Sequence, residues 1–399
     1  MMNFFYNRIG IIYSFLSIFL KYKNNTVLFD SFGGQYNDNP KYISEKLHEL
    51  YPDIDIVWTR SDKSKTLPPS YVKVIEYGSK DYFEYLYTSR VVIDNHSGLR
   101  TLYAKKDHFF KNILYSFISR KRKGQLCIST WHGTPLKKIG LDMPGGDSLR
   151  CHMNNDYMIS GCGLTERVLT STNRIKVVVK TYGTPRNDLL LDLNIDSSDI
   201  RKKLKLPLNK KIVLYAPTFR NSLIFSGIKQ MNELDFEKLL NILNLKFGGD
   251  WCFVYRLHNK VQDRIDLSKI KNKFPNIDYF NGNIDDDMAP YLQVSDILIT
   301  DYSSSLFDFA LTLKPCFIYA PDLEHYKNDE RGFYFDIKDL PYPISETSEE
   351  LYSSILNIDL DNMKNNIKLF LKDINNYEKG TASLSIVNDI LNFLRTKKK

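Results

Sequence analysis

The chain has 399 residues, which is enough for two domains of ordinary size. Its composition, with 43% hydrophobic and 26% charged residues, excludes an intrinsically disordered protein. The formal net charge of +8 favours an anionic partner, which could be a nucleic acid, a membrane face or a phosphate-bearing substrate. Five scattered cysteines without C-x-x-C spacing give no zinc or redox motif and indicate a reducing, cytoplasmic compartment.

The first apolar segment spans residues 9–20 and has basic neighbours, Arg8 before it and Lys21 after it. It is too short for a membrane-spanning helix, which needs roughly 20 residues. No small-residue cleavage site follows, which disfavours a signal peptide. Residues 1–24 are predicted to form a helix lying in the membrane interface, with its basic ends on anionic headgroups. A buried core helix is the alternative.

Short β-branched runs then alternate with longer amphipathic stretches in both halves of the chain. This alternation predicts an α/β fold of two doubly wound, Rossmann-like domains with parallel sheets, facing one another across a cleft. The domains are predicted at residues 25–190 and 211–399, with a polar linker at 191–210. Ligands of such sheets bind beyond the carboxyl ends of the strands. The predicted strands are residues 26–29, 54–58, 73–75, 91–94, 126–131, 211–216, 251–257, 277–280, 297–300 and 316–319, and the predicted helices include 40–50, 80–88, 235–245, 289–294 and 306–313.

Two smaller signals also follow predicted strands. SFGGQYNDNPK, residues 31–41, contains Gly33 and Gly34, which permit close approach of the backbone to a substrate. The pattern is not G-x-G-x-x-G, so a dinucleotide fingerprint is not supported. TYGTPRND, residues 181–188, places Arg186 just before the predicted linker.

The strongest local feature is STWHGTPLKKIG, residues 129–140. Gly133 permits a tight turn after a strand, and the Thr-Pro pair that follows predicts a helix start. His132 would then lie at a strand end as a general base, because the unperturbed pKa of histidine is near neutrality. A core histidine bound to a backbone carbonyl is the alternative. Lys137 and Lys138 follow directly and add positive charge.

A second group of polar residues follows two strands of the second half. In YRLHNK, residues 255–260, period-2 spacing would place Arg256, His258 and Lys260 on one face if the strand continued. Three basic groups there would make a phosphate clamp, and a solvated strand edge is the alternative. Thr218 follows another strand and presents a hydroxyl.

The third feature is ILITDYSSSLFDFALTLKPCFIY, residues 297–319. A buried strand ends at Asp301, and Ser303 and Ser304 open a helix that continues through Asp308. Hydroxyls and free N–H groups at a helix N-terminus form an anion site that suits a pyrophosphate, although one serine could simply cap the helix.

Several motifs are absent, which narrows the chemistry. The sequence has no P-loop, no H-E-x-x-H and no G-x-S-x-G. The acidic run 285–287 precedes a short helix and is predicted to cap it rather than to hold a metal. The sequence therefore predicts a reaction without a metal or cofactor.

Taken together and in order, these segments resemble one known family. They are STWHGTPLKKIG, YGTPRND, LYAPTFR, RLH and ITDYSSSLFDFA, with RGFYFD at residues 331–336. They are similar to the motifs of the CDP-glycerol glycerophosphotransferase family, which comprises teichoic-acid primases and polymerases and their capsule-locus relatives. The matches run from about Ser31 to Asp336.

The resemblance implies a glycosyltransferase-B architecture and a role for each matching residue. His132 corresponds to the proposed catalytic base, and His258 to a second catalytic histidine on the donor side. Around the donor phosphates and nucleotide the matching residues are Arg256, Thr218, Ser303, Ser304, Asp301 and Asp308. Gly33, Gly34, Lys137 and Lys138 are assigned to the acceptor or membrane side.

The resemblance also implies an activity and a location. The expected reaction transfers a polyol phosphate, most simply glycerol phosphate, from a CDP-polyol to a hydroxyl of a lipid-linked glycan or a growing teichoic-acid or capsule chain, releasing CMP. CDP-glycerol and CDP-ribitol both remain open as donors. The expected location is the cytoplasmic face of the cell membrane, as a peripheral protein. Lack of a large extension of the first domain favours addition of one or few units.

Three alternatives remain open from the sequence. One is a nucleotide-sugar-dependent glycosyltransferase of the same architecture. Another is a nucleic-acid-binding protein, which dispersed basic residues and the lack of a recognition motif disfavour. The last is an inactive homologue that only binds a glycan. The sequence gives no oligomeric state.

Overall fold

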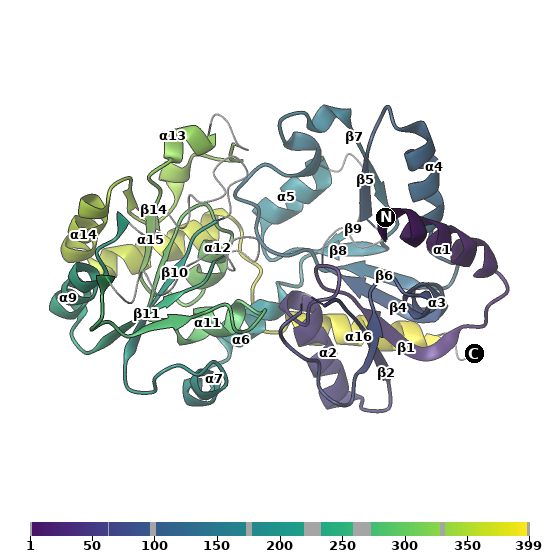
Figure 1. Cartoon of the computed structure of the whole chain (residues 1–399), viewed down its shortest axis with the longest axis horizontal. Helices are drawn as coiled ribbons and strands as arrows, with labels where there is room; N and C mark the ends of the chain where they lie inside the picture. The colour runs from purple at the N-terminus through teal and green to yellow at the C-terminus, as the bar shows by residue number, and fades with distance from the viewer. Residues whose placement is uncertain are drawn as a thin grey trace. The chain divides into compact units, whose positions relative to one another are not determined.

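The computed structural model describes residues 2–62, 64–95, 101–172, 178–218, 233–257, 273–327 and 332–396. The chain forms two compact units, each with its own parallel β-sheet (Figure 1). Unit 1 consists of Met1–Thr134, Ile139–Asp188 and Asn376–Lys399, and unit 2 of Pro135–Lys138 and Leu189–Asn375. The predicted α/β class with two parallel sheets is confirmed.

Unit 1 is built on a seven-stranded parallel sheet in the order β3-β2-β1-β4-β6-β8-β9. The strand order reverses between β1 and β4, as in a doubly wound sheet, so the carboxyl ends of these two strands flank the switch point where ligands bind. The strands are β1 (Lys23–Phe29), β2 (Asp55–Arg60), β3 (Lys73–Glu76), β4 (Ser89–Asp94), β6 (Leu126–Ser129), β8 (Tyr157–Ile159) and β9 (Val178–Lys180), and β5 (Thr101–Lys105) pairs separately with β7 (Leu149–Met153). The helices are α1 (Met2–Leu16), α2 (Asp38–Leu50), α3 (Lys80–Thr88), α4 (Phe109–Ile118), α5 (Gly163–Thr172) and α16 (Ala382–Thr396), with 3-10 turns η1 (Gly140–Asp142), η2 (Gly146–Ser148) and η3 (Pro185–Asn187).

Helices cover both faces of this sheet because alternate residues of each strand point to opposite faces. Val27 and Phe29 of β1 belong to a core cluster that includes α2 and α16, whereas Leu28 between them packs with α3 and α4. Figure 1 shows α2 and α16 side by side along the sheet, in agreement with their many contacts. The core of unit 1 therefore combines segments from the two ends of the described chain.

Unit 2 repeats the doubly wound order with six parallel strands, β12-β11-β10-β13-β14-β15. Its switch point lies between β10 and β13. The strands are β10 (Lys211–Ala216), β11 (Trp251–Tyr255), β12 (Tyr279–Asn281), β13 (Ile297–Thr300), β14 (Cys316–Tyr319) and β15 (Ile344–Ser345). The helices are α6 (Asp188–Leu191), α7 (Ser197–Lys203), α9 (Phe236–Phe247), α11 (Ala289–Val294), α12 (Ser305–Ala310), α13 (Leu323–His325), α14 (Ser348–Asn357) and α15 (Leu360–Asp373), with the 3-10 turn η6 (Ile337–Asp339).

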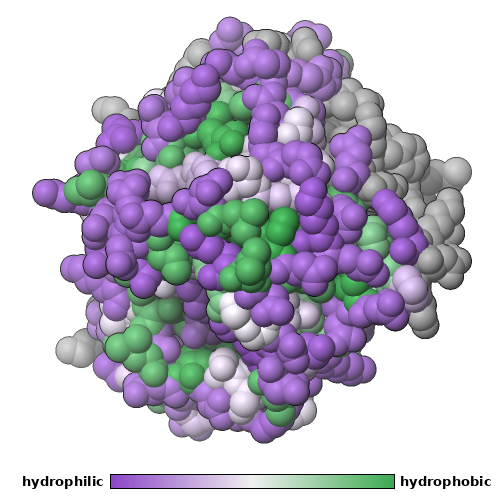
Figure 2. Space-filling model, turned by 90° about the vertical axis from the view of Figure 1, so that its left-hand side faces the viewer, coloured by the Kyte–Doolittle hydropathy of each residue, from purple (hydrophilic) through white to green (hydrophobic). Residues whose placement is uncertain are grey.

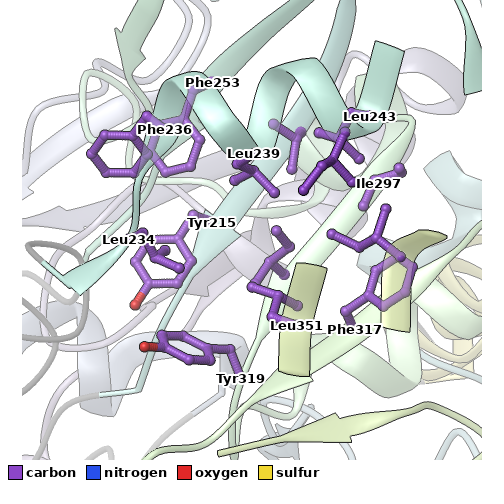
Figure 3. Packing of buried hydrophobic residues seen from close by; sticks show 14 of the residues in the cluster. Tyr215, Leu234, Phe236, Leu239, Leu243, Phe253, Ile297, Phe317, Tyr319 and Leu351 are labelled. Atoms are coloured by element: carbon purple, nitrogen blue, oxygen red, sulfur yellow. The ribbon is translucent and has the colours of Figure 1, made fainter. Parts of the chain in front are cut away.

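Large side chains from β10, β11, β13, β14, α9 and α14 form the core on one face of the unit 2 sheet. Figure 3 shows the rings of Phe236 and Phe253 in contact, with centroids 4.5 Å apart, and Leu239 and Leu243 of α9 directed into the same cluster. This packing joins α9 to the sheet strands whose ends carry the predicted donor residues.

The last helix returns to unit 1, which differs from the predicted domain of residues 211–399. The Asp188 carboxylate accepts hydrogen bonds from the backbone N–H groups of Ala382 at 2.9 Å and Ser383 at 2.8 Å, at the start of α16. The buried apolar side of α16 then covers the unit 1 sheet. The aspartate of the TYGTPRND segment thus anchors this helix, a role that its position in the sequence did not reveal.

Residues 191–210, predicted to be a polar linker, are folded onto unit 2. The Asp196 carboxylate caps α7 by accepting the Ser198 N–H at 2.8 Å. Leu204 and Leu206 are buried, with 4% and 6% exposure. The two leucines stand among lysines in KKLKLPL, and their burial outweighs the charged composition that suggested a linker.

One side of the helix α1 packs in the core of unit 1, as the core-helix alternative predicts, and a place in the membrane interface stays a prediction. Gly10 is buried, and a Cβ added there would lie 2.8 Å from the Phe83 ring, while Ile11 packs against the same core cluster. The other side leaves Ile12 and Phe15 exposed, at 54% and 55%. Among the residues that the structure describes, no helix is both long and apolar enough to cross a membrane.

Some predicted strands end earlier in the structure. β6 ends at Ser129 instead of residue 131, because Trp131 adopts the left-handed region with φ of 53°. β11 ends at Tyr255 instead of residue 257. The short strands β8, β9 and β15 were not predicted, since two or three residues carry too little pattern to recognise.

Replacement of Ile390 by alanine tests the place of α16 in the unit 1 core. Ile390 is fully buried in the cluster with α2 and β1, so Ile390→Ala should lower the free energy of unfolding by about 2–5 kcal/mol, measured by urea unfolding. Leu384 on the same helix is 40% exposed and serves as a control, because Leu384→Ala should change it much less. Equal effects of both variants would contradict the packing of α16 on the sheet.

Candidate active site

The loop after β1 and the residue after β4 meet at the switch point of unit 1. The Phe32 backbone N–H donates to Asn95 Oδ1 at 3.0 Å, and Asn95 Nδ2 donates to Ser31 Oγ at 2.9 Å. Ser31 Oγ in turn donates to Asn37 Oδ1 at 2.6 Å. Ser31 and Asn95 are fully buried, so this network fixes both loops across the switch point.

His132 lies beside this network, three residues after the end of β6, the strand next to β4. Its Nδ1 is 2.9 Å from the Asn95 carbonyl oxygen, and its ring lies edge-on to Phe32 with centroids 5.6 Å apart. A carbonyl oxygen only accepts hydrogen bonds, so Nδ1 carries the proton and Nε2 of the neutral ring carries the lone pair. The alternative of a core histidine shares this carbonyl contact, but the residue is only half-buried. The arrangement suits a general base.

Gly33 and Gly34 lie in the loop that contacts His132, and the structure explains one of them in full. A Cβ added at Gly34 would lie 2.4 Å from the backbone nitrogen of Ser61, and Gly34 has a φ of 108°. Gly33 also has a positive φ, of 71°, but its nearest neighbour is the Tyr77 ring at 3.7 Å. Glycine is therefore required at position 34, because this loop passes close to the backbone at the end of β2. An acceptor-side role for the two glycines stays a prediction.

A buried carboxylate, Asp30, organises the same loop. Thr59 Oγ1 donates to Asp30 Oδ1 at 2.8 Å, and backbone N–H groups of the loop residues Ser31, Gly33 and Gly34 also point to the carboxylate. Burial raises the pKa of Asp30 to about 6, although these hydrogen bonds act in the opposite direction. These loop amides are therefore directed to Asp30.

The residues after the histidine form no helix, contrary to the prediction from the Thr-Pro pair. Within unit 2, the Leu136 carbonyl accepts the Tyr334 N–H at 3.0 Å, and the Lys138 N–H donates to the Gly332 carbonyl at 3.2 Å. This extended pairing binds the backbone groups that a helix would have used. This strand-like segment of unit 2 contains Lys137, which is half-buried, and Lys138, which is exposed.

Asp301 and Thr218 come together at the switch point of unit 2. Asp301 is fully buried after β13, and its Oδ1 accepts the Thr218 N–H at 2.8 Å. Ser303 Oγ accepts hydrogen bonds from the N–H and the hydroxyl of Ser305, which begins α12. Ser304 is the N-cap residue, but its side chain makes no capping hydrogen bond. The predicted donor residues Thr218, after β10, and Ser303 and Ser304, after β13, thus lie at the ends of two adjacent strands.

Arg256 binds the backbone of its own unit. Its Nη1 donates to the carbonyls of Gly282 and Asp285, its Nη2 donates to the Asp286 carbonyl at 2.9 Å, and its guanidinium lies 4.9 Å from the centre of the Tyr291 ring. Burial lowers the pKa of Arg256. These contacts stabilise the turn before α11, and a contact with the donor phosphate stays a prediction.

The chain beyond β11 does not continue as a strand through residue 257, as the phosphate-clamp prediction required. The side chain of Asn283 instead pairs with both backbone groups of Leu257, accepting its N–H at 2.9 Å and donating to its carbonyl at 2.5 Å. His258 and Lys260 lie outside the residues that the structure describes, so their predicted roles stay predictions. Asn283 is 4% exposed and fixes the residue directly before His258.

The predictions for Asp308 and for the acidic run 285–287 have different outcomes in the structure. Asp308 is buried on α12, and its role stays a prediction. The run 285–287 does not cap α11, because the N-cap residue is Met288 and makes no side-chain capping bond. Within the described ranges, no group of three or more His, Cys, Asp or Glu side chains could hold a metal ion.

Several residues that fix His132 were not among the predicted site residues. Asn95 directly follows the predicted strand 91–94, and a polar residue at a strand end was the available signal. Asn39 lies in the segment SFGGQYNDNPK, whose pattern indicates a function only for the two glycines. Arg186 precedes the predicted linker, and nothing in its sequence context predicts a contact with the His132 segment.

The two doubly wound α/β units are those of the glycosyltransferase-B architecture, which confirms the predicted fold class. The sequence matches the family described as CDP-Glycerol:Poly(glycerophosphate) glycerophosphotransferase over residues 12–392, and the chain belongs to this family.

Individual relatives agree with this family. The chain is 32% identical over 386 residues to a teichoic acid poly(glycerol phosphate) polymerase of Bacillus spizizenii, covering 92% of this chain and 91% of that protein. It is 31% identical over 374 residues to a teichoic acid glycerol-phosphate transferase of Staphylococcus aureus, covering 87% and 88%. The structure of the wall teichoic acid polymerase TagF matches with a TM-score of 0.78 and 27% identity, over 99% of this chain and 95% of that one.

Some relatives are longer. The polymerases of Staphylococcus epidermidis and Bacillus subtilis are 30% and 29% identical to this chain, which spans only 46% and 49% of their lengths.

The buried carboxyl of Asp30 predicts a specific dependence of stability on pH. Because the folded state raises its pKa, Asp30 stabilises the fold fully below about pH 4 and loses that contribution as the pH rises through about 6. Asp30→Asn cannot titrate. The free energy of unfolding of the wild type relative to this variant should fall by on the order of 2–3 kcal/mol between pH 4 and pH 7. The free energies of unfolding of both proteins are measured by urea unfolding at several pH values. A difference between them that does not change with pH would contradict the raised pKa of Asp30.

Proposed function

We propose that the chain is an enzyme that transfers glycerol phosphate from CDP-glycerol to a hydroxyl group of a teichoic-acid-type acceptor. The acceptor oxygen attacks the β-phosphorus of the donor, the bond from this phosphorus to the bridging oxygen breaks, and CMP leaves with that oxygen. The acceptor proton passes to the base. The product is a phosphodiester, and membership of the glycerophosphotransferase family supports this reaction.

The observation that carries the proposal is the hydrogen bond between His132 Nδ1 and the Asn95 carbonyl. It presents the unprotonated Nε2, which can take the proton of an attacking hydroxyl. The half-buried ring is held at the carboxyl edge of a doubly wound sheet, where such folds bind their ligands.

The donor phosphates are assigned to the strand ends of unit 2. Thr218 and Ser303 lie at the switch point of this sheet, and the Ser304 hydroxyl is not used to cap α12. Hydroxyl and N–H donors of this kind stabilise the charge that develops on the leaving phosphate. His258 and Arg256 are assigned to the same donor side from the family motif. The proposal includes no resident metal, and activity that EDTA abolishes and a divalent cation restores would contradict that part.

CMP release distinguishes this function from its rivals. Acceptor-dependent CMP from CDP-glycerol supports the proposal, whereas CMP from CDP-ribitol alone would assign ribitol phosphate as the transferred group. Ribitol-phosphate polymerases are among the relatives, at 26% and 27% identity. Nucleotide release from a sugar donor, with no CMP from either polyol donor, would overturn the proposal in favour of a glycosyltransferase.

Replacement of His132 tests the general base. His132→Ala should lower kcat by at least about 100-fold, because general-base catalysis contributes roughly 10²–10⁴-fold. Affinity for CDP-glycerol, measured by calorimetry, should stay near the wild-type value. Turnover close to that of the wild type would remove the assignment of His132 as the base.

We further propose that unit 1 binds the membrane, where a lipid-linked acceptor would be found. α1 and α4 pack together, with the rings of Phe15 and Phe117 5.4 Å apart, and Figure 1 shows the two helices side by side. The outer sides of these helices and the turn directly after α1 carry exposed apolar residues, which we call the apolar face. It consists of Ile12, Phe15, Leu16, Ile18, Phe19, Phe109, Phe110, Ile113 and Phe117.

Basic residues accompany this apolar face. Lys21 follows α1, Lys111 lies on α4 and Lys123 follows α4, and all three are exposed. Lys121 instead pairs with Asp156. Apolar side chains with neighbouring lysines suit the surface of an anionic membrane. By comparison, the face drawn in Figure 2 is mostly hydrophilic, with hydrophobic residues in separate patches.

Point substitutions test this surface better than removal of α1, which contributes to the core. Phe19 and Phe110 are both 84% exposed, so the double variant Phe19→Ser/Phe110→Ser should fold normally. Its binding to vesicles containing phosphatidylglycerol should weaken at least about tenfold, since each buried phenylalanine contributes roughly 1.5–3 kcal/mol. Leu245 on α9 is 78% exposed, and Leu245→Ser serves as the control. Unchanged vesicle binding of the double variant would contradict the proposed surface.

A further inference from the structure

We propose that Asn39 and Arg186, with Asp38, are positioning residues that hold the backbone around His132 in its catalytic geometry. The proposal rests on the function proposed for His132. None of the three residues is assigned a direct contact with substrate. They act on the carbonyl groups of residues 130–132.

The segment around His132 cannot hold its own shape. Trp131 has a φ of 53° and Gly133 a φ of 126°, and neither a helix nor a strand includes residues 130–136. A non-glycine residue in the left-handed region costs on the order of 1–3 kcal/mol and persists only where its surroundings enforce it. The carbonyl groups of such a segment also lack regular backbone partners.

Side chains from two distant segments supply those partners. Asn39 Nδ2 donates to the carbonyls of Thr130 at 3.2 Å and Trp131 at 2.9 Å. Arg186 Nη1 donates to the carbonyl of His132 at 2.8 Å. Three consecutive carbonyls therefore accept hydrogen bonds from these two side chains, one from α2 and one from the turn η3, and the Trp131 carbonyl also accepts the Thr130 hydroxyl at 3.1 Å.

Further hydrogen bonds join these residues to one another. The Arg186 backbone N–H donates to Asn39 Oδ1 at 3.1 Å, and Arg186 Nη1 binds Asp38 Oδ2 at 2.7 Å. Asn39 is fully buried and Arg186 is 6% exposed, so these bonds form away from water and are geometrically restrictive. We call Asn39, Arg186 and Asp38 the carbonyl clamp.

The clamp determines where the imidazole points. The ring is fixed at Nδ1 by the Asn95 carbonyl, and that contact can form only if the backbone of His132 stays at its observed place. Movement of the backbone would break the ring contact and release the fixed tautomer. Because displacement of a catalytic group by about 1 Å can lower a rate about 100-fold, the clamp controls turnover without touching the substrate.

The chain offers a closely matched control for Asn39. Gln125 Nε2 donates to the carbonyls of Leu86 at 3.0 Å and Ser89 at 2.7 Å, and its Oε1 accepts the Arg122 N–H at 3.1 Å. It is 3% exposed and lies in unit 1. Each amide therefore binds two carbonyls and one N–H of the protein backbone. Asn39→Ala and Gln125→Ala remove equivalent sets of hydrogen bonds, but only the first set surrounds His132.

Kinetics of the folded variants test the clamp under the proposed function. Asn39→Ala should lower kcat for CMP release at least about tenfold with little change in affinity for CDP-glycerol. The limb of the pH–rate profile that depends on His132 should stay at the same pH as in the wild type. Gln125→Ala should keep the wild-type kcat per folded molecule, whatever its melting temperature. Equal losses of kcat in both variants would show a merely structural role and overturn the proposal. Arg186→Lys, which keeps the charge beside Asp38, is the second variant should Asn39→Ala fail to fold.

Nuclear magnetic resonance tests the clamp even if the enzyme has another activity. In protein labelled with ¹⁵N-histidine, the His132 signals, assigned through His132→Ala, should show the Nδ1–H tautomer in the wild type and in Gln125→Ala. Asn39→Ala or Arg186→Lys should shift them toward a mixture of tautomers. Retention of the Nδ1–H tautomer in both clamp variants would overturn the proposal. Absence of CMP release by the wild type would instead overturn only the proposed function.

Discussion

The carbonyl oxygen of Asn95 can accept a hydrogen bond but cannot donate one, and several segments of unit 1 together place His132 Nδ1 against it. The parallel order of β1, β4 and β6 brings three strand ends to one edge, which puts Asn95 and His132 within reach of each other. Ser31 and the loop after β1 hold the side chain of Asn95, and the clamp holds the backbone of the histidine. Two independent supports thus converge on one contact.

A similar device occurs in unit 2, although its target is different. Asn283 binds both backbone groups of Leu257, just as Asn39 binds two carbonyls in unit 1. In each unit a buried asparagine fixes irregular backbone next to a histidine of the family motif. Irregular backbone is where functional side chains can be aimed freely, and it needs side-chain amides because no strand or helix satisfies its polar groups.

The sequence predicted the features that depend on local pattern. Buried strands such as β10 and β13 have long apolar runs, and the residues that follow them were located correctly because strands end where polar residues begin. The prediction failed where distant contacts decide. The Thr-Pro pair after His132 has good helix-start chemistry, but pairing with residues 332–334 overrides it.

Long-range partners explain the other gaps in the same way. Asn39 and Arg186 stand almost 150 residues apart along the chain, and no periodicity joins them. The charged stretch 191–210 suggested a linker, because burial of two leucines against unit 2 leaves no mark in composition. Arg256 followed its strand as expected, yet its guanidinium binds carbonyls of the turn at 282–286, a turn that the sequence pattern did not locate.

The return of α16 to unit 1 has a consequence for biosynthesis. α2 and α16 form one side of the unit 1 core, but residues 38–50 leave the ribosome long before residues 382–396. Until the later segment emerges, the apolar surface of β1 and α2 has no cover, while all of unit 2 is being translated. Domains usually fold as they are synthesised, and exposed apolar surface invites aggregation. In this chain unit 2 can complete its core first, so the nascent unit 1 is the part that chaperones would need to protect.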